Sequence, residues 1–190
     1  MTIFMILAPY GAFTMLMMIS SAVVSLFAAA AMCLVAIAYD MFRGRSIKLL
    51  GAGSAFVFAA IGCYLALTGF AWSGSAVKLA VDIGVLAISL VSLAIGKPFT
   101  LQYAREAVDA ETAQLPGFLT ANYVITWAWA LAVLLMMMAN ALLIYLPGLP
   151  LWTGLLIAFA ARNTATYFTR WYPKYRKAKF GAPTAAPSGS

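Results

Sequence analysis

Charged residues inside apolar stretches are the first candidates for chemistry in this sequence. Lys78 and Asp82 are four residues apart in the apolar stretch 76–96, so a helix would place them on one face. A charge in an apolar layer is costly unless it is paired or reaches water. We therefore expect the two side chains to form an ion pair. The alternative is that Asp82 binds a proton or a cation on a transport path.

A third charge, Arg162, follows Leu151 by eleven residues in the last apolar stretch. We expect it to anchor this stretch at the boundary between the apolar layer and water, because its long side chain can reach toward polar surroundings. Two alternatives are binding of a lipid phosphate and pairing with Glu106, Asp109 or Glu111.

Uncharged polar groups occur in the stretch 118–146, where Asn122, Tyr123, Thr126 and Asn140 are expected to form hydrogen bonds between helices. The complete set of candidate polar sites is Lys78, Asp82, Arg162, Asn163, Asn122, Asn140, Arg105 and Glu106.

The residue types that usually carry catalysis or bind metals are scarce. The chain has no histidine, and its two cysteines, Cys33 and Cys63, stand alone in separate apolar stretches. Metal binding by thiolates needs clustered ligands, and no CxxC pair is present. We therefore expect no catalytic residue, no cofactor and no metal ion, hence a protein that is not an enzyme. We also expect the two thiols to lie at different depths and to form no disulfide.

Composition indicates the elements that position these residues. Of 190 residues, 65% are hydrophobic and 9% are charged, and the mean hydropathy is +0.96. About 20 apolar residues are needed to cross a hydrocarbon layer of about 30 Å. We predict an all-α polytopic transmembrane bundle, forming a single membrane domain over 1–180 and a disordered tail over 181–190. The five expected spans are 14–39, 49–70, 76–96, 118–146 and 151–170.

Residues 1–13 are expected to form an interfacial lead-in, because Pro9 and Gly11 break the first apolar stretch too early for it to span. The longest polar stretch, 96–117, is expected to contain a short amphipathic helix over 100–112, lying on the membrane surface.

Basic residues predict the orientation. They number 12 against 5 acidic residues, and they gather beside apolar stretches, as in Arg43, Arg45 and Lys48, or in the segment 170–179. By the positive-inside rule, we expect a bacterial-type inner membrane, an outside N-terminus and a cytoplasmic C-terminus. The same placement favours anionic lipid headgroups as partners over nucleic acid.

The order of several motifs resembles the intracellular septation protein A family. These motifs are Gly96, Lys97 and Pro98 after an apolar span, then Leu115 and Pro116, Asn122, the segment WAWAL at 127–131, and Asn140. The resemblance covers about 96–145. It implies a small five-span inner-membrane protein linked to envelope synthesis and division, and it supplies no catalytic residues. The ending FTRWYPKYRKAKF departs from the family pattern.

Three functions remain open at this point. The first is a non-enzymatic scaffold or envelope-associated protein that acts through protein and lipid contacts. The second is a small transporter or channel that uses Asp82 and Arg162. The third is an accessory subunit that binds membrane-protein partners or a second copy of the chain. A transporter would place Asp82 and Arg162 in a cavity between helices, whereas a scaffold would pair them or hold them at the headgroups.

Overall fold

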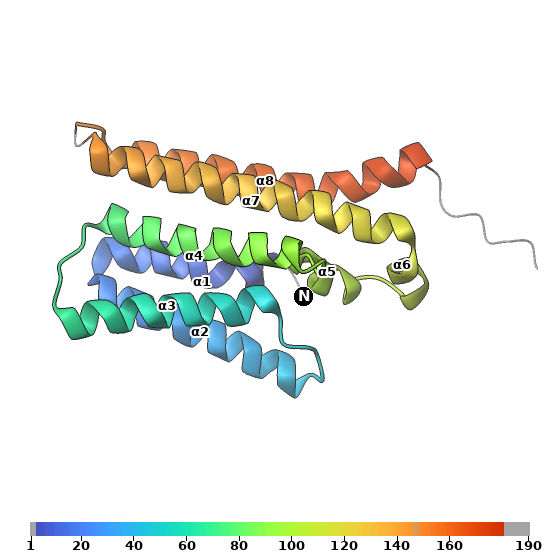
Figure 1. Cartoon of the computed structure of the whole chain (residues 1–190), viewed down its shortest axis with the longest axis horizontal. Helices are drawn as coiled ribbons and strands as arrows, with labels where there is room; N and C mark the ends of the chain where they lie inside the picture. Colours follow the sequence, from blue (N-terminus) through green and yellow to red (C-terminus); the bar gives the residue numbers. More distant parts are fainter. Residues whose placement is uncertain (1–2, 147, 181–190) are drawn as a thin grey trace, which may run out of the picture.

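The computed structural model describes residues 3–146 and 148–180, and the described chain consists of helices and loops without strands (Figure 1). The expected all-α fold is therefore confirmed. The expected tail, 181–190, and the first two residues of the lead-in lie outside the described residues. The elements are α1 (Ile3–Ile19), α2 (Ala22–Phe42), α3 (Leu49–Thr68), α4 (Gly74–Ala94), α5 (Phe99–Arg105), α6 (Ala110–Gln114), α7 (Pro116–Tyr145) and α8 (Leu151–Phe180).

Four helices are long and apolar enough to cross a membrane, judged by length and composition. They are α2, α3, α4 and the Gly117–Tyr145 part of α7. α8 is not among them, because the polar and basic residues of its second half lower its hydropathy. The four candidate spans indicate a multi-pass membrane protein.

The expected span 14–39 is wrong, because the chain turns in its middle. α1 ends at Ile19, and Ser21 adopts an extended conformation (φ −69°, ψ 155°) before α2 begins. Its side chain caps α2 by accepting a hydrogen bond from the backbone N–H of Val24 at 3.3 Å. The residues expected as an interfacial lead-in therefore belong, from Ile3 onward, to a separate helix that continues through Pro9.

α1 runs back along α2, so its first described residues lie at the same end of the bundle as the α2–α3 loop and the end of α8 (Figure 1). The hydroxyl of Tyr10 contacts that of Ser54, near the start of α3. Later in α1, Met17 lies beside Gly74, at the start of α4. The expected outside N-terminus depended on one continuous helix over 14–39, and this arrangement removes that basis.

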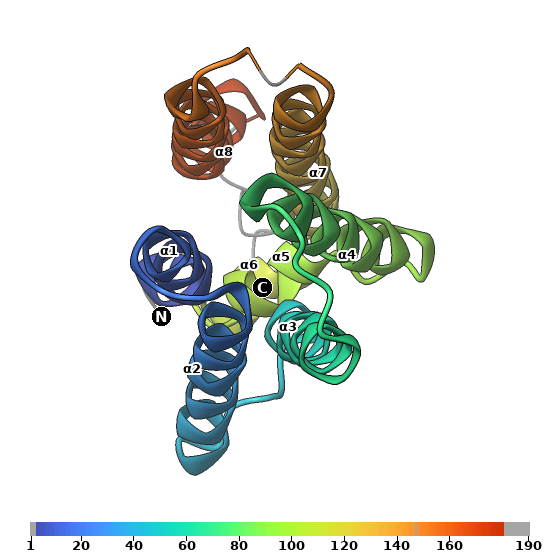
Figure 2. The same ribbon diagram turned by 90° about the vertical axis from the view of Figure 1, so that its left-hand side faces the viewer.

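The six long helices lie around an arc in chain order, each packed against the next (Figure 2). α1 and α8 occupy the two ends of this arc and do not pack along their lengths. The two ends of the arc therefore do not pack together into a closed ring.

α3 and α4 approach closely because each has a glycine opposite a branched side chain of the other. A Cβ atom at Gly84 would lie 2.6 Å from a methyl carbon of Val57, and one at Gly53 would lie 2.7 Å from the terminal carbon of Ile88. Small residues at such positions allow helix backbones to approach in an apolar medium.

The loop 96–117 differs from the single surface helix expected over 100–112. It folds into two short helices, α5 and α6, and Phe99, Thr100 and Leu101 of α5 are buried. α5 is held at one end of the bundle, because the hydroxyl of Thr100 forms a hydrogen bond of 2.7 Å with the hydroxyl of Thr126 on α7. It is therefore part of the packed end of the bundle.

Candidate functional site

The inner side of the arc encloses a cavity of about 1040 Å³, to which α1, α4, α5, α7 and α8 all contribute lining residues. This volume matches pockets that hold a drug-sized ligand. α5 lines the cavity through Phe99, Thr100 and Tyr103, at the end nearest the basic loops. Most of the wall is apolar, so its few polar groups define what the cavity can recognise.

Asp82 of α4 lies in this wall and is joined to α7. Its Oδ2 accepts a hydrogen bond of 2.8 Å from the side-chain amide of Asn140, which also lines the cavity. The bond joins residues 58 positions apart in the chain. The expected interhelical role of Asn140 is therefore confirmed.

The expected ion pair between Lys78 and Asp82 is wrong. Within the described part of the chain, no ammonium or guanidinium nitrogen lies within 4.0 Å of the Asp82 carboxylate. Lys78 and Asp82 do share one face of α4, and both line the cavity. The side-chain amide of Asn140, and not the ammonium of Lys78, contacts the carboxylate.

Arg162 also lines the cavity, from α8. Its guanidinium has no hydrogen bond or ion pair with any described residue, and Glu106, which was considered as a partner, contacts other cations instead. Arg162 and Lys78 interact electrostatically with Asp82 at longer range. Arg162 therefore lies in the wall of a cavity between helices, and its expected role as an anchor at the interface stays a prediction.

The remaining candidate sites divide between the cavity and other places. Asn122 borders the cavity, and its side-chain amide donates to the carbonyl of Phe118 in its own helix at 2.9 Å. Its bond to another helix is formed by its backbone carbonyl, which accepts from the hydroxyl of Thr100 on α5 at 2.9 Å. Asn163 is exposed and donates to the carbonyl of Phe159. Arg105 is exposed at the end of α5, outside the cavity lining.

Sequence reasoning missed the contributions of α1 and of the tryptophan on α7. Tyr10 and Thr14 line the cavity, although they fall where the lead-in was expected to end. Trp129 lines it as well, and its indole N–H donates to the hydroxyl of Thr169 on α8 at 3.0 Å. Asn122 and Trp129 are seven residues apart and therefore share one face of a helix, a spacing that could have suggested this wall.

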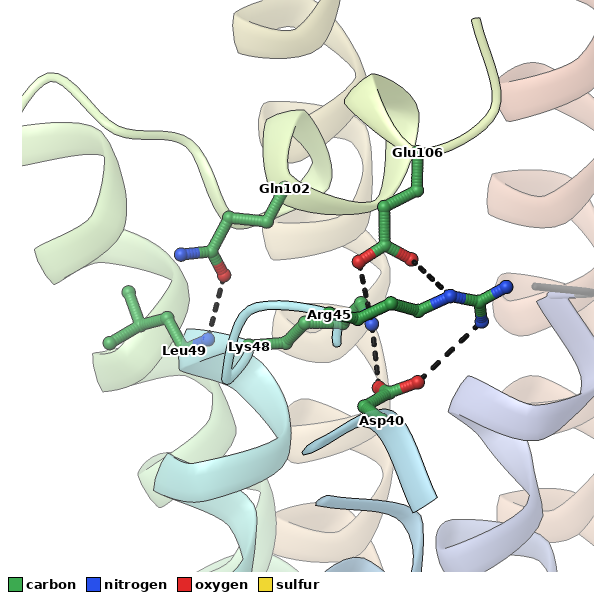
Figure 3. Close-up of polar contacts among 6 residues, drawn as sticks. All are labelled: Asp40, Arg45, Lys48, Leu49, Gln102 and Glu106. Carbon is green, nitrogen blue, oxygen red and sulfur yellow. Dashed lines mark hydrogen bonds and ion pairs between the residues drawn. The ribbon is translucent and has the colours of Figure 1, made fainter. Parts of the chain in front are cut away.

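A second group of charges lies at the basic end of the bundle, formed by Asp40, Arg45, Lys48 and Glu106 (Figure 3). We call it the buried charge cluster. Lys48 Nζ lies 2.6 Å from Asp40 Oδ2 and 3.1 Å from Glu106 Oε1. Arg45 lies 3.6 Å from Asp40 and 3.9 Å from Glu106. Lys48 is only 3% exposed.

The buried charge cluster joins the α2–α3 loop to α5, and two neighbouring contacts strengthen this connection. The backbone N–H of Leu49 donates to the side-chain carbonyl of Gln102 at 2.7 Å (Figure 3). Lys48 Nζ lies 5.4 Å from the ring centre of Tyr103, which lines the cavity from α5, and burial raises the pKa of this phenol above its usual value. The cluster thus holds the helix that lines one end of the cavity.

Comparison of the chain with protein-family models, curated proteins and solved structures gave no match. The fold and the cavity define the chain as an all-helical, multi-pass membrane protein with a mainly apolar interhelical pocket that contains three charged side chains.

Proposed function

We propose that this protein is a small transporter-type membrane protein that binds a solute in the cavity between α1, α4, α7 and α8. The observation that carries the proposal is that Asp82 and Arg162, from helices distant in the chain, line one cavity. Ionisable groups within spans are costly and commonly mark substrate pathways when they face a cavity. Within the described residues neither charge has an ion-pair partner, whereas the scaffold hypothesis expects the two charges to be paired or held at the headgroups.

The proposed location is a bacterial-type inner membrane with the basic loops in the cytoplasm. In this proposal the five membrane spans are α2, α3, α4, α7 and the part of α8 before Arg170. α1 has 17 residues, so it extends about 26 Å and adds a shorter sixth helix beside α2. Because Arg43, Arg45, Lys97 and the basic end of α8 share one end of the bundle, the positive-inside rule favours that end as cytoplasmic. The start of α1 would then be cytoplasmic too.

A septation-linked scaffold is the competing hypothesis, and it makes a different prediction about water. A solute-binding cavity must admit water, whereas a scaffold of this fold needs no water inside the bundle. Cysteine labelling separates the two, because charged methanethiosulfonate reagents modify thiols in water and not thiols facing hydrocarbon.

The test uses two positions on α8, in a chain that carries Cys33→Ala and Cys63→Ala. Ala158 lines the cavity, and Ala160, two residues later, is exposed on the outside of the bundle. We expect the reagent to modify Ala158→Cys in intact membranes and to leave Ala160→Cys unmodified. Failure to modify Ala158→Cys, or equal modification at both positions, would contradict the proposed function.

A further inference from the structure

We propose that the ligand of this cavity is an amphipathic anion, with a phosphate or carboxylate group attached to an apolar chain. The inference rests on the proposed function and names the class of solute. It depends on the charges of the wall, on its apolar remainder and on the side from which the cavity can be reached.

The charges in the wall are unbalanced. Among the described lining residues, Lys78 and Arg162 are basic and Asp82 is the one acidic residue. The wall carries a net positive charge whether Asp82 is ionised or neutral. The Asp82 carboxylate already accepts a hydrogen bond from Asn140, and no described carboxylate lies within 4.0 Å of the guanidinium of Arg162. A bound anion would supply the missing partner.

Arginine suits this role because its planar guanidinium can donate two parallel hydrogen bonds to a phosphate or a carboxylate. Lys78 adds a second cation on α4, one helical turn from Asp82. The hydroxyl of Tyr10, another polar group in the wall, is already directed to Ser54. Arg162 and Lys78 are thus the two cationic groups of the wall that can bind an anionic head.

The rest of the wall favours an apolar body on the same ligand. Phe13 and Met17 of α1, Val81 of α4, and Val133 and Met136 of α7 line the cavity. A small hydrated anion would leave these side chains in contact with water, which costs free energy in proportion to the apolar surface left uncovered. An alkyl chain would cover them.

The arrangement of the arc also favours a ligand that partitions into lipid. α1 and α8 line the cavity but do not pack along their lengths, so no packed pair of helices closes the arc between them (Figure 2). In a bilayer this side of the arc would face the hydrocarbon layer. A ligand with an apolar chain could therefore enter from the membrane.

Trp129 supplies a probe inside the cavity, because bromine quenches indole fluorescence on contact. The experiment titrates the purified full chain in lipid nanodiscs with 11-bromoundecyl phosphate. We expect saturable quenching that is lost in Trp129→Phe. Trp127→Phe is the matched control, because Trp127 is 56% exposed on the outside of the same helix, and this variant should retain the saturable component.

Charge variants test the anion-binding groups. Arg162→Gln should weaken binding about tenfold or more, since it removes a charge-assisted contact. Arg162→Lys should restore part of the loss. Asp82→Asn should tighten binding, because it removes the negative charge that Asp82 contributes to the wall, and the exposed Arg170→Gln on the same helix should have no effect. Thermal unfolding of each variant is the control: an unchanged melting temperature would show that a loss of binding is not caused by misfolding.

Two further compounds complete the test. Saturable quenching by 11-bromoundecyltrimethylammonium that depends on Asp82 would overturn the inference and identify a cationic ligand. Displacement of the alkyl phosphate by an equal concentration of inorganic phosphate would overturn the role of the apolar chain. If Ala158→Cys is labelled while no brominated compound quenches Trp129 saturably, the ligand class is wrong and the proposed function stands.

Discussion

The ammonium group of Lys48 lies 2.6 Å from Oδ2 of Asp40, and both side chains are almost completely buried at the basic end of the bundle. The sequence places these residues at the end of one helix and the start of the next, where loop charges usually face water. Glu106 and Arg45 complete a group of two anions and two cations whose formal charges cancel. Removing one member alone would leave a buried charge without compensation.

Single and paired substitutions in the buried charge cluster should therefore differ. Lys48→Met or Asp40→Asn alone should lower the free energy of unfolding by about 3 kcal/mol, because each unbalances the cluster. The double variant keeps Arg45 against Glu106 and should recover part of the loss. Unfolding in mixed detergent micelles measures this, with the exposed Lys97→Met as control. If the double variant loses as much free energy of unfolding as the two single variants together, the proposed coupling of Lys48 to Asp40 is wrong.

Asp82 should be coupled more strongly to Asn140 than to Lys78. It accepts a hydrogen bond from Asn140 and has no ion pair with Lys78. Double-mutant cycles with alanine should give a coupling of about 1 kcal/mol for Asp82 with Asn140, near the range for polar contacts in membrane proteins. A larger coupling of Asp82 with Lys78 would restore the ion pair expected from the sequence.

Helix packing should be sensitive to substitution at Gly84, which faces Val57 of α3, and tolerant of it at Gly51, which faces Ile37 of α2. A Cβ atom at Gly84 would meet the stiff side chain of Val57 at 2.6 Å, whereas at Gly51 the nearest atom would lie 3.9 Å away. Gly84→Ala should lower the free energy of unfolding by about 1 to 3 kcal/mol. Gly51→Ala should be neutral or stabilising, because alanine favours the helix. Equal effects at the two positions would contradict this close approach.

The start of α6 should respond to acid below the usual range for aspartate. Asp109 accepts a hydrogen bond of 2.7 Å from the backbone N–H of Thr112, and this bond lowers its pKa. The capping contribution is therefore fully present above the ordinary value of about 3.9 and is lost as pH falls through the lower folded pKa. The amide resonance of Thr112 should titrate with a midpoint below that value in NMR spectra, and the transition should disappear in Asp109→Asn. A midpoint at or above the ordinary value would contradict the cap.

Both described ends of the chain should lie on the cytoplasmic side. Fluorescent protein fused to either terminus should be bright, and alkaline phosphatase fused after α8 should be inactive. Phosphatase inserted in the α3–α4 loop, at the opposite end of the bundle (Figure 1), should be active. A dark N-terminal fluorescent fusion beside a bright C-terminal one would favour the single span over 14–39.

The sequence by itself determined the helical class and most of the long elements. Apolar stretches of about 20 residues bounded by polar segments predicted α2, α3, α4 and α7 within a few residues, apart from the start of α2, because length and hydropathy are local properties. The turn at Ser21 was missed, since one serine pair in an apolar stretch looks the same whether it caps a helix or packs inside one.

Only the tertiary structure decided what the charges do. Lys78 and Asp82 are four residues apart, which predicted a pair, yet Asn140, 58 residues away along the chain, holds the carboxylate. Arg162 faces a cavity because α8 lies across it from α1 and α4. Lys48 is buried because Glu106, which follows α5, packs against the α2–α3 loop. Spacing along one helix establishes which side chains share a face, whereas the energy of a charge depends on the partners and solvent that other helices bring to that face.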